Sequence, residues 1–593
     1  MIDFDSIVSL DFETKGIVDG GPLLPYPVGC AIKRGRGESR YWSWGHPTEN
    51  NCTEEEFRGV IQSIWEEEWL TQNGATFDVP IAEHYFGAGL KKRDPLLTHD
   101  TLFMAYLHDP HARSLSLKDL AEDWLGMPPE EQQEMYDWLQ AHVPECRRSR
   151  KACGAYISEA PGSMVGRYAI GDTDRTHALA EFLHQVLGHM GEAYDRERFL
   201  APILADIQNR GVRCDLERLK ADYAKAVEKK HQLENMIRDH LKQGPEFNPG
   251  SDKELGAVLL RLGYSGFMTT PTGKVSMAKP SLEKALEGDP VLRSMLNSRS
   301  KYDTLIGTFM GPWIAYAEAN GGRIHASYNQ VRNPDGFGTR TGRLSSSKPN
   351  FQNVPTDQGL DHFGDPFPVM RSYLLPEEGH VWVCGDFKNQ EPRITAHFEE
   401  GALMQAFIDD PMLDPYMFVA ELCKIDRKPS KTILLGIIYA MGAATMAERL
   451  GIDAQTTTIY RNIIKANLPD VVALDQDCKK RFRHGLPIRT LGGRLYYCEP
   501  PSNGRSWEYK ALNTLIQGSA ADQTKEAMVW IKPHLDKLGA RLLGTVHDEI
   551  SVSCRPEHVE AVNKLMQMSA NHLPCDVPMV MDINHGASWA EAK

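Results

Sequence analysis

The chain of 593 residues lacks several features that define simple protein classes. It has no run of roughly 18 to 20 uninterrupted apolar residues, so a membrane span is not expected. Its 11 cysteines include no CxxC pair, which argues against a disulfide framework and a standard zinc site. A reducing, cytoplasmic setting is expected. The N-terminal MIDFDSIVSLDFETKG carries acids where a signal peptide has basic residues, so we expect it to open the first domain as a strand.

Positive charge is also in deficit. The chain has 66 Lys and Arg against 80 Asp and Glu, which gives a net charge of −14. This balance argues against general nucleic-acid binding, although local pattern outweighs global charge. Carboxylates clustered in metal sites would account for part of the surplus. A DNA-binding enzyme of this charge needs a basic groove, and its affinity should fall steeply with salt. The run RRSRK at 147–151 is interpreted as a solvated face, with a DNA contact left open.

The length predicts roughly three to five domains. Residues 1–190 alternate strand-like and helix-like runs, and long charged amphipathic helices such as ERLKADYAKAVEKKHQLENMIRDHL follow up to about 325. Residues 326–400 are rich in strand and loop patterns, 401–490 are helical, and 491–593 combine a hairpin with helices. We therefore expect a multidomain chain of the α/β and α+β classes.

Two distant aspartates carry the strongest chemical signal. Asp386 in VWVCGDFKNQEPR and Asp548 in RLLGTVHDEISVS each follow or interrupt an apolar, strand-like run, so a fold could place both carboxylates at strand ends. Two bare carboxylates in contact repel, and one would be driven neutral. A pair of divalent cations removes that conflict and can clamp both ends of a phosphoryl transfer.

A predicted helix between the two aspartates suits a triphosphate. In RKPSKTILLGIIYAMG, Arg427, Lys431, Leu435 and Tyr439 recur every fourth residue and share one helical face. Pro429 fits the first turn, and the cationic half of the face coincides with the positive end of the helix dipole. Alone, the stripe could be an amphipathic helix with a basic end. Together with the two aspartates, it indicates a template-directed nucleotide polymerase.

Several segments resemble a known family. GDFKNQEPR, RKPSKTILLGIIYAMG and VHDEI resemble motifs A, B and C of the family A, Klenow-type DNA polymerases. TGRLSSSKPNFQNVP at 341–355 is similar to the segment that contacts primer-template, and NTLIQGSAAD at 513–522 and the C-terminal GASWAEAK also match. These segments occur in the family's order across residues 190–593.

The resemblance implies a DNA polymerase that extends a primer 3′-hydroxyl with dNTPs by two-metal nucleotidyl transfer. Asp386, Asp548 and the Phe387 carbonyl would hold two Mg²⁺ ions, with Mn²⁺ as an alternative. The implied nucleotide-binding residues are Arg427, Lys431, Leu435, Tyr439, Glu391 and Tyr416. Lys431 would contact the phosphates and protonate the leaving group, and Glu391 would exclude a ribose 2′-hydroxyl.

The implied primer-template contacts test base-pair geometry at the minor groove, where acceptors are similar for all pairs. They are Arg343, Gln352, Asn353, Asn513, Gln517 and His547. Glu549 is interpreted as structural or as tuning the metal site without ligating an ion, and Arg393 is interpreted as structural. The chain departs from the family pattern at Leu435, where the family mostly has Phe or Tyr, and at Tyr416, where many relatives have His. Ala440 and Tyr509 also differ from the usual glycine and arginine.

A second set of acids lies near the N-terminus. Asp11 and Glu13 in SLDFET leave the same face of a strand, a costly arrangement without a cation. With Asp78 and Asp172, they resemble the DEDD exonucleases of the RNase H-like fold, and Tyr168 matches the tyrosine of one form of that group. The resemblance implies a proofreading 3′–5′ exonuclease that uses two Mg²⁺ or Mn²⁺ ions, with Tyr168 orienting the attacking water. Asp174 should matter less.

The expected domains are an RNase H-like exonuclease at 1–190, followed by a right-hand polymerase. Its parts would be the thumb at 191–325, the first part of the palm at 326–400, the fingers at 401–490 and the second part of the palm at 491–593. The absence of a preceding 5′-nuclease resembles the layout of bacteriophage replicative enzymes. The expected partners of a monomeric enzyme are primer-template DNA and dNTPs, with helicase, single-strand-binding and processivity proteins left open.

Two alternatives remain at this point. A single-subunit RNA polymerase shares a similar palm and motif helix, but Glu391 would crowd a ribonucleotide. A catalytically dead DNA-binding scaffold would have no use for six metal-binding carboxylates, which would only repel DNA.

Overall fold

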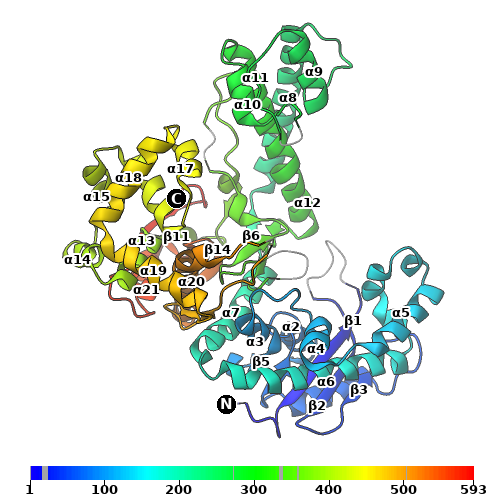
Figure 1. Cartoon of the computed structure of the whole chain (residues 1–593). Helices are drawn as coiled ribbons and strands as arrows, with labels where there is room; N and C mark the ends of the chain where they lie inside the picture. Colours follow the sequence, from blue (N-terminus) through cyan, green and yellow to red (C-terminus); the bar gives the residue numbers. More distant parts are fainter. Residues whose placement is uncertain (1, 17–23, 271–272, 333–337, 357–358, 503) are drawn as a thin grey trace. The chain divides into compact units, whose positions relative to one another are not determined.

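The computed structural model describes residues 2–16, 24–270, 273–332, 338–356, 359–502 and 504–593. The chain forms two compact units, which are labelled by element in Figure 1. Unit 1 contains Met1–Arg210, Ser327–Ser347 and Val383–Asn584, and unit 2 contains Gly211–Ala326, Lys348–Trp382 and His585–Lys593.

The N-terminal part of unit 1 is built on a five-stranded mixed sheet in the order β3-β2-β1-β4-β5. Strand β1 pairs antiparallel with β2 and parallel with β4. Val8, Leu10 and Phe12 point to one face of β1 and pack in an apolar core, so Asp11 and Glu13 share the opposite face. The strands are β1 (Val8–Thr14), β2 (Pro27–Arg34), β3 (Arg40–Ser43), β4 (Trp69–Thr71) and β5 (Thr98–Asp100).

Helices surround this sheet. They are α1 (Glu54–Ser63), α2 (Asp78–Phe86), α3 (Thr101–His108), α4 (Leu117–Leu125), α5 (Glu130–His142), α6 (Gly162–Leu187) and α7 (Gly191–Arg210), with the short 3₁₀ turns η1 (Pro95–Leu97), η2 (Pro144–Arg148) and η3 (Arg150–Glu159). Thr53 caps α1 in a capping box with Glu56, which satisfies backbone donors at the helix start. The expected alternation of strands and helices is confirmed from β1 to α3, whereas the described elements from α3 to residue 190 are all helical.

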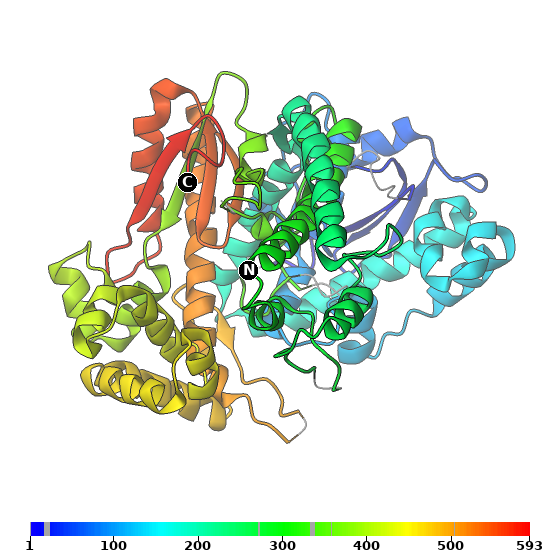
Figure 2. The same ribbon diagram turned by 90° about the horizontal axis from the view of Figure 1, so that it is seen from above.

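The remainder of unit 1 combines a four-stranded sheet in the order β14-β15-β11-β16 with a group of helices. Helix α20 lies along this sheet, as Figure 2 shows. The strands are β8 (Ser327–Asn329), β9 (Ser345–Ser347), β11 (Val381–Phe387), β12 (Ile488–Arg489), β13 (Leu495–Tyr496), β14 (Arg541–Val546), β15 (Glu549–Cys554) and β16 (Met581–Gly586). The helices are α13 (Gln390–Glu399), α14 (Ala402–Asp409), α15 (Pro415–Cys423), α16 (Arg427–Ile438), α17 (Ala443–Leu450), α18 (Ala454–Asn467), α19 (Pro469–Arg483), α20 (Ala511–Lys537) and α21 (Val559–Ala570), with the turns η7 (Glu508–Lys510) and η8 (Pro556–His558).

Unit 2 is mainly helical, and its small sheet has the order β10-β6-β7. Its strands are β6 (Val212–Cys214), β7 (Arg323–Ile324) and β10 (Leu374–Leu375), and its helices are α8 (Leu216–Leu241), α9 (Asp252–Arg261), α10 (Lys279–Ala285), α11 (Pro290–Thr304) and α12 (Gly311–Ala319), with the π-helical turn η4 (Leu305–Met310) and the 3₁₀ turns η5 (Phe351–Asn353) and η6 (Met370–Tyr373). Helix α8 confirms the long charged helix expected from its sequence, with Leu219, Ala226 and Leu233 buried along one face.

The units divide the chain differently from the expected domain boundaries. Helix α7 belongs to unit 1, not with the helices that follow it, because it buries residues such as Leu200 and Leu204 there. Residues 348–382, expected in the palm, belong to unit 2. They are held there by pairing of β10 with β6 and by stacking of Trp382 on Trp589, whose ring centroids lie 5.8 Å apart.

A network of buried charges ties α7, α20 and the β12–β13 hairpin together within unit 1. Glu197 accepts hydrogen bonds from Lys525 at 2.7 Å and from Arg494 at 2.5 Å, and Arg494 also bonds Asp522 at 2.9 Å. Burial alone would raise the pKa of Glu197, but Lys525 and Arg494 outweigh it and lower the pKa to about 2. The network therefore keeps this buried carboxylate ionised at neutral pH.

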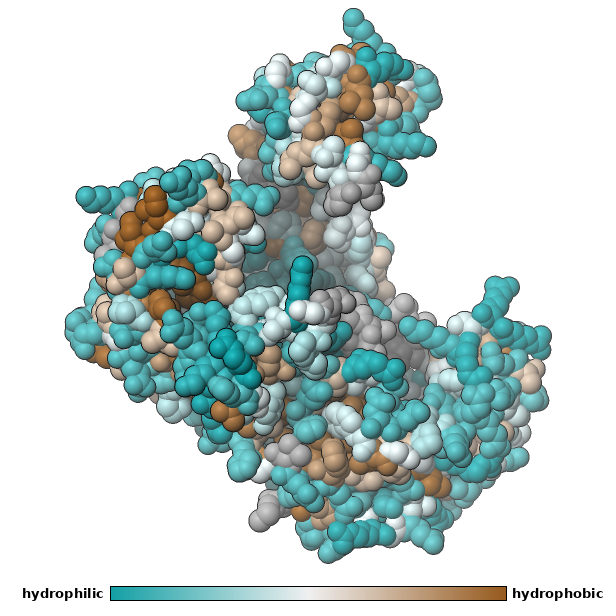
Figure 3. Space-filling view, in the orientation of Figure 1, coloured by the Kyte–Doolittle hydropathy of each residue, from teal (hydrophilic) through white to brown (hydrophobic). Residues whose placement is uncertain are grey.

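Within the described residues, no helix combines the length and apolar character needed to cross a bilayer. The face shown in Figure 3 is largely hydrophilic, and apolar side chains gather on the helices around α15 and α18. Exposed large side chains on these two helices include Met417 and Ile459.

Candidate active sites

The two distant aspartates line one pocket of unit 1. The pocket has a volume of about 540 Å³, and its lining includes Asp386, Phe387 and Asp548. Asp386 lies near the end of β11, and Asp548 lies in the turn between β14 and β15. The backbone N–H of Phe387 donates to the Asp548 carbonyl at 3.2 Å, because β11 and β15 are neighbours in the sheet. The fold thus brings the two aspartates to one cavity, as their sequence context suggested.

The predicted helix is α16, and the four residues of its stripe line the same pocket. Arg427 occupies its first turn, and Tyr439 caps its C-terminus. Arg427 also pairs with Asp414 at 2.5 Å, and Asp414 caps the start of α15. Tyr416, which is 4% exposed, lies under the cationic groups of Arg427 and Lys431, each 5.4 Å from its ring centroid. One side of the pocket is therefore cationic, and its two cations pack on an aromatic ring.

Glu391 and Arg343 form an ion pair in this pocket. Glu391 is in the first turn of α13, and Arg343 precedes β9. Burial raises the pKa of Glu391, and the nearby Arg343 guanidinium opposes that shift. A residue expected to exclude a 2′-hydroxyl and one expected to contact primer-template are thus direct partners.

The other predicted DNA contacts are more widely spread. His547 is exposed in the β14–β15 turn with φ +57° and lines the pocket. Asn513 and Gln517 lie one turn apart on α20, so they share a face of that helix. Gln352 and Asn353 belong to unit 2.

Arg393 and Glu549 are both buried, which is compatible with the structural roles expected for them. The guanidinium of Arg393 is fully buried and donates to the carbonyls of Lys388, Pro578 and Pro411 at 2.9, 2.8 and 2.6 Å. Glu549 is 1% exposed at the start of β15.

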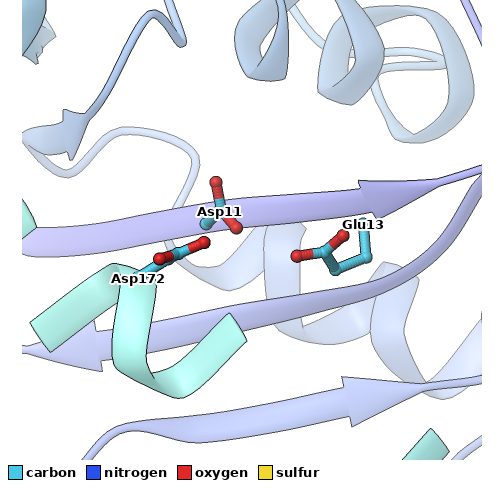
Figure 4. Close-up of side chains that lie close together, drawn as sticks. All are labelled: Asp11, Glu13 and Asp172. Atoms are coloured by element: carbon cyan, nitrogen blue, oxygen red, sulfur yellow. The ribbon is translucent and has the colours of Figure 1, made fainter. Parts of the chain in front are cut away.

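The N-terminal acids form a second site in unit 1. Oxygen atoms of Asp11, Glu13 and Asp172 lie within 4.8 Å of one another. Figure 4 shows the Asp11 and Glu13 side chains leaving one strand and Asp172 approaching them from a helix. Burial, followed by repulsion from neighbouring carboxylates, raises the pKa of Asp11 well above its usual range and that of Glu13 to about 8. Asp11 and Glu13 are therefore unfavourable as anions in this buried site without a cation.

Asp78 lies beside this group but outside the set of three. Its carboxylate accepts the N–H of Phe12 at 2.7 Å, and it begins α2. Burial raises the pKa of Asp78 to about 7. Asp174 points elsewhere, because it pairs with Lys33 at 2.8 Å and accepts from the Ser39 hydroxyl at 2.7 Å.

Lys118 is a site residue that sequence reasoning did not identify. Its ammonium donates to Asp172 at 2.6 Å and to the Tyr168 hydroxyl at 2.9 Å, so it links two of the predicted residues. The only signal in the sequence was its place in SLSLKDLAEDWLG, which resembles a segment that accompanies the DEDD acids. Asp414 and Lys525 were also missed at the first site, where both line the pocket. No motif marks either of them.

Both sites fit divalent metal ions. The N-terminal group offers only carboxylate oxygens, the ligands that Mg²⁺ and Mn²⁺ prefer. A bound cation would also offset the burial and the carboxylate repulsion that together raise the pKa of Glu13. At the first site, Asp386 and Asp548 supply carboxylates to a pocket that also holds Lys431 and Arg427, suited to an anionic ligand.

Known proteins match both the sequence and the fold. DNA polymerase I of Pseudomonas aeruginosa is 31% identical over 454 residues, which cover 72% of this chain and 48% of that protein. Thermostable DNA polymerase I of Thermus aquaticus is 29% identical over 81% of this chain and 58% of its own length. A DNA-directed DNA polymerase of Pseudomonas phage M6 is 28% identical over 73% of this chain and 71% of its own length. The chain thus spans about half the length of the bacterial relatives.

A solved structure shares the fold over nearly the whole chain. It is the POL domain of Pol1 from M. smegmatis in complex with DNA primer-template and dNTP, with a TM-score of 0.77 and 23% identity. The match covers 99% of this chain and 95% of that one. A sequence model of DNA polymerase family A matches residues 216–591, more than half of the chain. The chain belongs to DNA polymerase family A.

Proposed function

We propose that the chain is a DNA-directed DNA polymerase that extends a primer with dNTPs and removes 3′-terminal nucleotides at a separate site. The observation that carries the polymerase assignment is the single pocket that holds Asp386, Asp548 and the α16 stripe. The group of Asp11, Glu13 and Asp172 carries the exonuclease assignment. The unit 1 sheets would be an RNase H-like exonuclease and a palm, with α14–α19 as the fingers and the helices of unit 2 as the thumb.

At the polymerase site, Asp386 and Asp548 would hold Mg²⁺, with the Phe387 carbonyl as a further ligand. Divalent ions bound there would lower the pKa of the primer 3′-hydroxyl and stabilise charge on the phosphates. Arg427 and Lys431 would bind the triphosphate at the positive end of α16. Arg427 would exchange Asp414 for a phosphate, and Lys431 would give a proton to the leaving pyrophosphate.

The sugar of the incoming nucleotide would lie against Glu391, Tyr439 and Leu435. Glu391 would exclude a 2′-hydroxyl both by volume and because its ion pair with Arg343 leaves it in one position. Arg343, His547, Asn513 and Gln517 would contact the primer-template, and Gln352 and Asn353 would add contacts from unit 2. The volume of the Glu391 side chain in this pocket favours this function over ribonucleotide polymerisation.

At the exonuclease site, Asp11, Glu13, Asp78 and Asp172 would hold Mg²⁺ or Mn²⁺. Tyr168 would orient the water that attacks the terminal phosphodiester. Lys118 keeps the Tyr168 hydroxyl and the Asp172 carboxylate adjacent, which restricts where that water can lie. Proofreading would follow if a mispaired primer end reached this site.

A primer-extension assay tests both assignments. With Mg²⁺ and dNTPs the protein should lengthen a primer on its template, and without dNTPs it should shorten the 3′ end. Asp548→Ala should abolish extension and retain shortening, whereas Asp11→Ala should do the reverse. Loss of both activities in either variant would contradict two independent sites. A preference for rNTPs over dNTPs would contradict the assignment as a DNA polymerase.

A further inference from the structure

A turn that precedes β9 carries Arg343 into the polymerase pocket. The turn, residues 339–343, closes on itself through the Thr339 hydroxyl, which donates to the Arg343 carbonyl at 2.8 Å. Just before it, the Gly338 N–H donates to the Ser345 hydroxyl at 2.9 Å. The position of the Arg343 guanidinium on Glu391 therefore depends on how firmly this turn is held.

The turn is held by a residue of the N-terminal part of unit 1. The hydroxyl of Tyr106, on α3, accepts the Gly342 N–H at 2.9 Å and donates to the Thr339 carbonyl at 2.8 Å. Tyr106 is 1% exposed and lies in the apolar core beneath α3. One phenol oxygen thus binds a donor and an acceptor from both ends of the turn.

The turn is also closely packed at Gly342. Gly342 has φ +83°, and a Cβ there would lie 3.2 Å from Arg494 Cζ and 3.3 Å from the Tyr496 hydroxyl. Arg494 is fixed by Glu197 and Asp522, and its guanidinium carbon lies 5.8 Å from the centre of the Tyr106 ring. The turn therefore contacts both α3 and the buried charge network. Among the described residues of α3, only Tyr106 makes side-chain hydrogen bonds to the turn.

We propose that Tyr106, although it lies in the exonuclease part of the chain, is a positioning residue for nucleotide addition. It holds the 339–343 turn so that Arg343 meets the primer terminus and Glu391 in one geometry. The proposal rests on the proposed polymerase function. It assigns to α3 a second task, since the helix also packs behind the exonuclease sheet.

Single-turnover incorporation of a correct dNTP tests the proposal, because it separates the rate constant from the active fraction. Tyr106→Phe keeps the ring and removes only the hydroxyl. We expect its rate constant to fall about tenfold, with the amplitude and the apparent affinity for dNTP near the wild-type values. A variant that merely unfolds in part would lose amplitude at an unchanged rate constant.

Tyr194→Phe is the matched control. The Tyr194 hydroxyl is also buried and accepts the Asp100 N–H at 3.0 Å, but it does not contact the turn. We expect its incorporation rate to stay within about twofold of wild type. Arg343→Ala completes the test as a double-mutant cycle, in which Tyr106→Phe should cause no further loss if it acts through Arg343.

The possible results distinguish a failure of the proposed role of Tyr106 from a failure of the proposed polymerase function. A wild-type rate constant in Tyr106→Phe, a loss of amplitude alone, an equal loss in Tyr194→Phe, or losses that multiply in the double variant would each overturn the role of Tyr106. No incorporation by the wild-type protein would instead overturn the proposed polymerase function, and the inference with it.

Discussion

At the scale of single residues, the polymerase pocket is organised by pairs of opposite charges. Arg427 pairs with Asp414, and Arg343 pairs with Glu391. Each cation is thereby placed before substrate binds, so less side-chain entropy remains to be lost on binding. Substituting the acidic partner of either cation should therefore change how the pocket binds nucleotide or primer.

Glu391→Ala should relax sugar selection. Removing the carboxylate opens space for a 2′-hydroxyl and frees Arg343 from its partner, so the ratio of kcat/KM for dNTP over rNTP should fall by about tenfold or more. Glu391→Gln is the control, because it keeps the volume and removes the charge. Steady-state incorporation of matched dNTP and rNTP measures the ratio. An unchanged ratio in the alanine variant would show that another residue selects the sugar.

Lys118→Met should selectively weaken the proposed exonuclease activity. The methionine keeps most of the length of the side chain but cannot bond Tyr168 or Asp172, so degradation of a single-stranded 3′ end should slow by about tenfold while primer extension is retained. Lys33→Met is the control, since Lys33 makes a similar ion pair with Asp174, which we expect to matter less. Equal effects of the two variants would argue against a specific role for Lys118.

At the scale of elements, the packing of α7, α20 and the β12–β13 hairpin is joined by the buried carboxylate of Glu197. Glu197 is fully buried and is compensated by Lys525 and Arg494. Removing one partner of such a network leaves an uncompensated charge in an apolar setting, which typically costs about 3–5 kcal/mol. Gly518 allows α20 to pack closely against the β12–β13 hairpin, because a Cβ at this position would lie 2.8 Å from Thr490 Cγ2.

Glu197→Gln should therefore lower the thermal midpoint of unfolding at pH 7. Because the folded pKa of Glu197 is lowered to about 2, its ionised form stabilises the fold above pH 4.5, and this contribution is lost as the pH falls towards 2. The deficit of the variant should thus narrow as the pH falls from 4.5 to 3. Glu192→Gln, at an exposed position of the same helix, is the control. A deficit that is constant with pH would contradict the assigned ionisation.

Sequence alone predicted the features that depend on short periods. The shared face of Asp11 and Glu13 follows from strand alternation, and the stripe from Arg427 to Tyr439 follows from helical spacing. The ion pairs of Lys118 with Asp172 and of Arg343 with Glu391 could not be predicted this way, because their partners lie 54 and 48 positions apart. The pair of Asp414 with Arg427 joins two consecutive helices whose packing no short period predicts. The same is true of Tyr106, whose contact with Gly342 spans 236 positions.

At the scale of the whole molecule, each of the two compact units is assembled from three separate stretches of the chain. Residues 348–382 and 585–593 join unit 2 through strand pairing and aromatic stacking, although they lie far from α8 in sequence. Family membership, by contrast, was predicted from short motifs and is confirmed by the match over residues 216–591.

The net charge of −14 makes DNA binding depend on local cations. Primer-template affinity should fall by about 100-fold or more between about 50 and 200 mM salt, because each neutralised phosphate releases counterions. Fluorescence anisotropy with a labelled primer-template measures the dependence. Affinity that does not change with salt would show that few phosphates are contacted.

The central claim is that Asp386 and Asp548 jointly hold the metal ions of DNA synthesis. A crystal structure with primer-template, a non-hydrolysable dNTP and Mn²⁺ tests it most directly, since anomalous scattering locates the ions. We predict Mn²⁺ bound by both carboxylates and by the triphosphate, beside the primer 3′ end. A triphosphate bound without an ion between the two aspartates, or an ion held by other residues, would contradict it.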